Sequence, residues 1–379
     1  MEIYLDNSAT TRVCTAACNA AVSAMRDCYG NPSSLHHMGF QAEKLMDTAR
    51  SQIARALGCM EEELVFTSGA TESNNLAVTG LTAAYPRAGK KIVTTAIEHP
   101  SVLEPCRRME EAGYTVVRLP LDENGQITPE AFGAAVDTDT ALVSFMLVNN
   151  EVGTLLDAQR ICRIIKQKSP GTMIHIDAVQ GFCKVPFRLK QVLADTVSIS
   201  GHKIYAPKGI GALYIRKGVR IRPLVVGGGQ ERNLRSGTES VPLAAAFGAA
   251  VAETYPRLEQ HLAWYRELRA GLLEQLAEIP EAVIHSSPEG VPYIVNFSVR
   301  GIRSEIMLHH LEKDGIYVSS GSACAKGAQS HVLQALGLPR ADIDTAIRVS
   351  FSPETDKTQI DALVLGIKKG LATLARQGR

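Results

Sequence analysis

The chain has 379 residues, of which 45% are hydrophobic and 21% are charged, and its formal net charge is +1. This length and balance predict one large folded domain with a smaller companion, and they exclude a disordered chain. A net charge near zero provides no general attraction to nucleic acids or membrane surfaces, so we expect neither as a partner.

The N-terminal stretch MEIYLDNSATT lacks the basic and apolar regions of a signal peptide. No apolar run approaches the roughly 18 residues of a membrane span, so we expect a soluble, cytoplasmic protein. The eight cysteines contain no C-x-x-C pair and are expected to be reduced thiols. Cys14 and Cys18 have no second ligand pair nearby, and no metal site is predicted.

Between about residues 60 and 215, short segments rich in Val, Ile, Thr and Phe alternate with longer amphipathic ones. The predicted strands are 63–68, 91–97, 140–148, 172–177 and 195–200, and helices are predicted at 72–85 and 101–113. Strands that alternate with helices indicate an α/β fold with a mostly parallel central sheet covered on both faces.

The pattern changes after about residue 238. One or two long helices follow, broken near Pro256, and short strands are predicted at 293–299 and 347–352. We therefore expect a large α/β domain over 13–255. A smaller α+β domain would combine 1–12, whose EIYLD segment supplies a strand, with 256–379.

Polar residues follow each predicted strand of the large domain. They are Thr71, His99, Asn150, Asp177 and Lys203. Because ligands of open parallel α/β sheets bind beyond the carboxyl ends of the strands, five such residues indicate a single site.

Three of these positions suggest the kind of ligand. In TSGATES, Gly69 permits a turn and Thr71 lies at a helix start that favours an anion, although an ordinary helix cap explains the stretch equally well. Asp177 suits a pyridinium nitrogen, with a helix cap or a metal ligand as alternatives. His99 suits stacking and proton transfer, or is simply a loop residue.

Lys203 completes the set, since a partly desolvated lysine amine has a lowered pKa and can form a Schiff base. Together with an aspartate for a ring nitrogen and a cradle for a phosphate, it points to pyridoxal 5′-phosphate as the cofactor. The loop GGGQERNLRSGT at 227–238 is expected to be flexible and polar, and it suits either an anion or plain solvent.

Ten motifs together resemble the NifS/IscS-like cysteine desulfurases, which belong to the class V aminotransferase family of fold-type I pyridoxal-phosphate enzymes. The motifs are YLDNSATT, GNPSSLH, FTSGATESNN, EHPSV, NNEVGT, HIDAVQ, SGHKIYAPKGIGALY, RSGTES, SSGSAC and IRVSFS. They run in order from residue 4 to about 352, which is nearly the whole chain.

The resemblance implies a role for each matching residue. Lys203 would carry the cofactor, Asp177 would pair with its ring nitrogen, Gln180 would bind its ring hydroxyl and His99 would stack on the ring. Ala70, Thr71, Ser200 and His202 would bind the phosphate, with Thr238 reaching it from the other subunit of a homodimer. Asn150 and Arg348 would hold the substrate carboxylate, and Cys324 would be the nucleophile that receives sulfur.

Two of these roles agree with the local sequence. In AIRVSFS the apolar residues Ile347, Val349 and Phe351 share one face and leave Arg348 on the other, where its guanidinium suits a carboxylate; a surface arginine on an edge strand is the alternative. Cys324 lies in SSGSACAKGAQS, a segment of small residues near Lys326 that favours a partly ionised thiol.

The expected activity is conversion of L-cysteine to L-alanine, with the sulfur left on Cys324 as a persulfide for an acceptor protein. A selenocysteine lyase or another class V enzyme is the alternative, and a catalytically silent sulfur-relay protein is a third. Only AKGAQ separates Cys324 from SHVLQALG, and the chain ends in KKGLATLARQGR. Both features leave the acceptor open between iron–sulfur cluster assembly and thiolation of tRNA or a cofactor.

Overall fold

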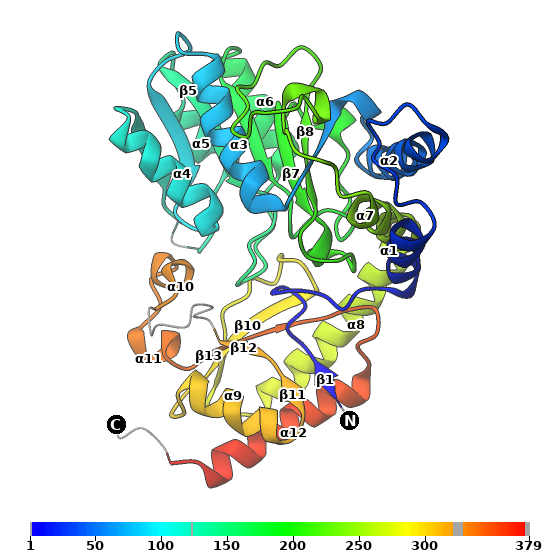
Figure 1. Cartoon of the computed structure of the whole chain (residues 1–379). Coiled ribbons are helices and arrows are strands. Elements are labelled where there is room, and N and C mark those ends of the chain that lie inside the picture. The colour runs from blue at the N-terminus through cyan, green and yellow to red at the C-terminus, as the bar shows by residue number, and fades with distance from the viewer. Residues whose placement is uncertain (1, 123, 321–328, 376–379) are drawn as a thin grey trace.

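The computed structural model describes residues 2–122, 124–320 and 329–375, with one large sheet in the upper part of Figure 1 and two small sheets in the lower part. The large sheet contains β2 (Leu64–Thr67), β3 (Lys91–Thr95), β4 (Thr115–Leu119), β5 (Thr140–Met146), β6 (Met173–Asp177), β7 (Thr196–Ser200) and β8 (Gly211–Ile215). The five strands predicted in this region all form.

The seven strands lie in the order β2-β8-β7-β6-β5-β3-β4. The neighbours β7, β6, β5, β3 and β4 pair in parallel, and β8 runs antiparallel to both β7 and β2. The α/β class and the mostly parallel sheet are therefore confirmed. The prediction lacked β4 and β8, because β4 is a half-exposed edge strand and β8 begins at a glycine that suggested a turn.

Helices cover both faces of this sheet. They are α3 (Ala70–Ala84), α4 (Pro100–Glu111), α5 (Pro129–Ala135), α6 (Ala158–Lys168) and α7 (Val241–Thr254), and two further helices, α1 (Thr15–Arg26) and α2 (His37–Leu57), pack against α7. Successive strand residues face opposite layers: Val65 packs in the cluster with α3 and α4, whereas Phe66 joins the main core with α5, α6 and α7. Strands buried on both faces explain why their sequences are apolar runs rather than alternating patterns.

The lower part of the molecule contains α8 (Leu258–Ala277), α9 (Ser304–Lys313), α10 (His331–Ala335), α11 (Arg340–Ile343) and α12 (Lys357–Thr373). Its four-stranded sheet has the order β12 (Ser319–Ser320), β13 (Ala346–Ser350), β10 (Ile294–Val299) and β9 (Ala282–Ile284), and β1 (Ile3–Tyr4) pairs in parallel with β11 (Ile316–Tyr317). A 3-10 turn at Tyr255–Arg257 separates α7 from α8, which agrees with the predicted break near Pro256.

Within the described ranges, no helix combines the length and the apolar character needed to cross a membrane.

Candidate active site

The carboxyl ends of β2, β3, β5, β6 and β7 lie at one edge of the large sheet, and each leads into a predicted site residue. Thr71 lies in the first turn of α3, His99 caps α4, Asn150 follows β5, Asp177 ends β6 and Lys203 ends a 3-10 turn after β7. The charges of Asp177 and Lys203 both affect the pKa of His99, so these three side chains are close in space.

Lys203 is held by the N-terminal segment of the chain. Its Nζ donates to the carbonyl oxygens of Ser8 at 2.6 Å and Ala9 at 2.7 Å. Burial, with a further contribution from Arg348, lowers the pKa of Lys203 to about 8. The amine is therefore much closer to its neutral, nucleophilic form than an exposed lysine.

Asp177 is a buried carboxylate with two donors. Its Oδ2 accepts from Asn74 Nδ2 at 2.7 Å, and its Oδ1 accepts from the backbone N–H of Val179 at 3.0 Å. Burial raises its pKa, whereas both hydrogen bonds and the nearby His99 and Lys203 favour the charged form. A protonated ring nitrogen would supply the opposite charge that this buried group needs.

The side-chain amide of Gln180 makes a hydrogen bond through its nitrogen but, among the described residues, none through its oxygen. Its Nε2 donates to the carbonyl oxygen of Ser8 at 2.9 Å, and its buried Oε1 has no partner among the described residues. An acceptor left open at this position fits a ring hydroxyl, since buried polar atoms are normally hydrogen-bonded.

The residues expected to bind a phosphate come from the start of α3, the end of β7 and the 3-10 turn that follows β7. Gly69 precedes the helix with φ +152, and a Cβ built there would have no atom within 4 Å, so the backbone borders open space. Ser200 ends β7 and is buried, and His202 Nδ1 lies 3.2 Å from Thr10 Oγ1. Free N–H groups at the start of a helix favour an anion.

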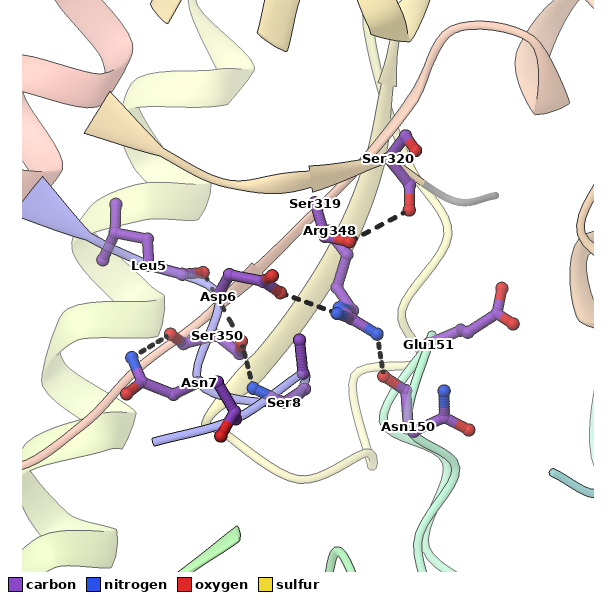
Figure 2. A network of polar contacts seen from close by, with 12 residues as sticks. Leu5, Asp6, Asn7, Ser8, Asn150, Glu151, Ser319, Ser320, Arg348 and Ser350 are labelled. Carbon is purple, nitrogen blue, oxygen red and sulfur yellow. Dashed lines mark hydrogen bonds and ion pairs between the residues drawn. The ribbon is translucent and has the colours of Figure 1, made fainter. Parts of the chain in front are cut away.

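Arg348 lies in the network of Figure 2, only 3% exposed. Its Nη1 donates to the carbonyl oxygen of Asn150 at 3.0 Å, its Nη2 donates to Asp6 Oδ1 at 2.7 Å, and its buried Nε has no partner among the described residues. Since β13 lies between β12 and β10, the alternative of a surface arginine on an edge strand is wrong.

The loop at 227–238 differs from the flexible segment expected. Glu231 is buried, accepts from Arg50 at 2.6 Å and from the backbone N–H of Phe66 at 2.8 Å, and Arg235 pairs with Glu72 at 2.9 Å. These contacts fix the loop against α2, β2 and the start of α3. Thr238 is exposed.

Cys324 lies outside the described residues. Before it, Ser319 of β12 pairs with Arg348. After it, the hydroxyl of Ser330 donates to the carboxylate of Glu151. The described residues Ser319 and Ser330, which flank this segment, therefore lie beside Arg348 and next to Asn150, the residues expected to hold the substrate carboxylate.

Three contributors to the site were missed by sequence reasoning: Asp6, Ser8 and Asn74. Asp6 and Ser8 follow a strand of only two residues, which carries no periodic signal. Across the part of the chain that the structure describes, no group of three or more His, Cys, Asp or Glu side chains is placed to hold a metal ion.

The chain matches the aminotransferase class-V family model over residues 3–363. It is 42% identical to a cysteine desulfurase of a Nostoc strain, with 96% of this chain and 91% of the relative covered. It is 40% identical to the cysteine desulfurase IscS of Serratia proteamaculans, with 99% and 94% covered.

Solved structures agree with this likeness. A NifS-like protein superimposes with a TM-score of 0.94 at 38% identity, covering 99% of this chain and all (100%) of the other. A NifS-like protein from Rickettsia africae gives a TM-score of 0.88 at 30% identity, with 98% and 100% covered.

The chain thus belongs to the aminotransferase class-V family of pyridoxal-phosphate enzymes, and within that family to the NifS/IscS-like cysteine desulfurases. Its cofactor is pyridoxal 5′-phosphate, and its activity is that of a cysteine desulfurase, which takes L-cysteine as substrate and passes sulfur to an acceptor.

Proposed function

We propose specific roles for the residues of this cysteine desulfurase. Lys203 carries the cofactor and acts as the base, Asp177 pairs with the ring nitrogen, Gln180 Oε1 accepts from the ring hydroxyl and His99 stacks on the ring. Ala70, Thr71, Ser200 and His202 hold the phosphate, Asn150 and Arg348 hold the substrate carboxylate, and Cys324 receives the sulfur. The observation that supports these roles is the open Oε1 of Gln180 close to Lys203, because Gln180 Nε2 and Lys203 Nζ both donate to the carbonyl oxygen of Ser8. The buried carboxylate of Asp177 is close enough to Lys203 to affect its pKa.

The bound cofactor supplies an electron-withdrawing ring that stabilises negative charge at the substrate Cα. Arg348 fixes the substrate carboxylate through donors that already lie in a buried, ordered position. Lys203, with its lowered pKa, takes the Cα proton and returns a proton as the product forms.

Sulfur transfer is a nucleophilic displacement by the thiolate of Cys324. The new bond joins the two sulfur atoms, and the bond between the substrate sulfur and its Cβ breaks, with the electron pair going to the carbon skeleton. L-Cysteine and one enzyme thiol are thereby converted to L-alanine and one enzyme persulfide, which balances without an external oxidant.

The test compares alanine release from L-cysteine by the wild type and by Cys324→Ala, with Cys18→Ala as a control at an exposed cysteine. We expect Cys324→Ala to lose at least about a hundredfold in rate, because a covalent step is removed, and Cys18→Ala to match the wild type. Alanine release by Cys324→Ala at the wild-type rate would refute the assigned nucleophile.

We further propose that the persulfide is passed to an acceptor protein of iron–sulfur cluster assembly or of tRNA or cofactor thiolation. Relatives named IscS support the first pathway. The division into a large domain (13–255) and a small domain (1–12 with 256–379) and the cytoplasmic location stay predictions.

We also propose a homodimer in which Thr238 reaches the phosphate of the partner subunit. Large apolar side chains that are exposed in the single chain support a covered surface; they are Tyr29, Leu35, Phe40 and Val226. Sedimentation at micromolar concentration should give twice the chain mass of 40.8 kDa. A wild-type protein that sediments as a monomer with full activity would contradict this proposal.

A further inference from the structure

A continuous row of hydrogen-bonded polar side chains connects the interior of the large sheet with two of the proposed cofactor residues. It begins at Thr196 on β7 and passes through His175 on β6, Asn74 on α3 and Ser101 on α4 to His99. Asp177 joins the row through Asn74. The first three members are 0% exposed, so their hydrogen bonds must be made within the protein.

Asn74 fixes the direction of the row. Its Nδ2 lies 2.7 Å from Asp177 Oδ2 and 2.8 Å from Ser101 Oγ, and its Oδ1 lies 3.0 Å from His175 Nε2. An amide nitrogen can only donate and an amide oxygen can only accept. This orientation of the amide gives the ionised Asp177 a donor, and it makes His175 donate from Nε2.

The proton positions at the far end of His175 follow. Burial lowers the pKa of His175 to about 3, so its ring is neutral and carries one proton. With that proton on Nε2, Nδ1 is an acceptor, and the hydroxyl of Thr196 at 2.9 Å is its donor. Both ring nitrogens are thereby satisfied.

The proton positions toward His99 follow in the same way. Ser101 Oγ accepts from Asn74, and its own hydrogen is then free to point at His99 Nδ1, 2.8 Å away. The backbone N–H of Ser101 donates to the same nitrogen at 3.1 Å. A nitrogen that accepts from two donors carries no proton, so a neutral His99 carries its proton on Nε2.

We propose that Asn74 and His175 are positioning residues that set the proton arrangement of two cofactor residues at once. Through Asn74 they donate to Asp177 and hold it ionised against the ring nitrogen. Through Ser101 they keep His99 in the tautomer that carries its proton on Nε2, because Ser101 of α4 donates to the other ring nitrogen, Nδ1. This inference rests on the proposed roles of Asp177 and His99.

Histidine-selective ¹⁵N NMR of the holoenzyme tests the proton positions directly. The two resonance pairs are assigned by their disappearance in His175→Gln and His99→Gln. We expect both rings to show a protonated Nε2 and an unprotonated Nδ1. A protonated Nδ1 on either ring would overturn the proposal, because one link of the row would then point the other way.

Substitutions then test whether His175 controls the sites beyond it. We expect His175→Leu to populate both tautomers of His99 and to weaken pyridoxal 5′-phosphate binding about tenfold, because Asn74 loses the donor that fixes its amide. His175→Gln, which can still donate, should restore both properties. His285→Leu is the control, because His285 contacts Ser298 in the small sheet at 2.6 Å and lies outside the row.

An unchanged His99 tautomer and unchanged cofactor affinity in His175→Leu would refute the inference that His175 positions Asn74 and, through it, the cofactor residues. If that variant does not fold, the tautomers of the wild type still decide. Failure of the proposed function would be seen in a different measurement, as alanine release by variants that lack Lys203 or Cys324. The NMR measurement of the two tautomers does not use that assay, so the two failures can be told apart.

Discussion

At the scale of single residues, the N-terminal segment holds the two cations of the site. The carbonyl oxygens of Ser8 and Ala9 bind Lys203, and the carboxylate of Asp6 binds Arg348 (Figure 2). The charge of Asp6 also partly offsets the effect of Arg348 on the pKa of Lys203. A buried arginine needs such a partner, since an unpaired charge in the interior is costly.

We predict that Asp6→Ala raises the KM for L-cysteine about tenfold with a smaller change in kcat. The reason is that Arg348 loses the charged acceptor that orients its guanidinium, and a hydrogen bond to a charged group contributes about 1.5–3 kcal/mol. Asp6→Asn keeps an acceptor and should have the smaller effect. Steady-state kinetics measure both, and an unchanged KM in Asp6→Ala would contradict the assignment.

A second prediction concerns the pH dependence of cofactor uptake. Because the pKa of Lys203 is lowered to about 8, its amine is mostly protonated below that pH and mostly neutral above it. The rate at which cofactor-free protein takes up pyridoxal 5′-phosphate should therefore rise with pH and level off above about 8. Stopped-flow absorbance measures this rate, and a continued rise toward pH 10 would show that the lysine is not perturbed.

The sequence predicted Asp177, Lys203 and Arg348 as site residues but not their partners, and the difference has a physical cause. Residues at the carboxyl ends of parallel strands meet at one edge by topology alone, so their order along the chain was informative. Asp6 reaches Arg348 across 342 positions and Asn74 reaches Asp177 across 103. No local periodicity encodes such pairings, and the acid after the short apolar run in YLDNSATT was the one available signal.

At the scale of elements, the loop at 227–238 is fixed by two ion pairs in its middle part. Glu231 joins it to Arg50 on α2 and to the backbone of β2, and Arg235 joins it to Glu72 in the first turn of α3. Arg235 also offsets the negative charge of Glu72 near the expected phosphate position. Its hydrogen bond to Glu72 holds the pKa of that carboxyl below its usual range.

We predict that Glu231→Ala destabilises the protein by about 3–5 kcal/mol, because it leaves Arg50 with an unpaired, largely buried charge. The matched control is Glu130→Ala, which breaks an exposed pair with Arg160 and should change stability by at most about 1 kcal/mol. Urea unfolding of the two variants measures the difference. Equal midpoints would mean that the buried pair does not fix the loop.

Glycine-rich segments and very short strands were the parts of the secondary structure that the sequence predicted least well. The strands β2, β3, β5, β6 and β7 were predictable, because runs of β-branched residues buried on both faces are distinctive. The loop at 227–238 was predicted to be flexible from its three consecutive glycines, yet its acidic and basic residues decide its conformation through contacts with α2 and α3.

At the scale of the whole molecule, the site is assembled from the edge of the large sheet and from β13 of the small one. Lys203 and Asp177 come from the first, Arg348 from the second, and the residues between β1 and α1 bind to both. With the proposed roles of Arg348 and Lys203, the substrate carboxylate would be held by the small sheet and the cofactor by the large one, so we expect a change in either sheet to alter substrate binding.

Mass spectrometry of the alkylated peptide that contains Cys324 measures whether the sulfur of L-cysteine passes to this residue. Holoenzyme mixed with L-cysteine in the absence of an acceptor or reductant should form one alanine and one persulfide per subunit, with the persulfide on Cys324. Alanine formed without that modification, or a persulfide found first on another cysteine, would show that Cys324 is not the nucleophile that receives the sulfur.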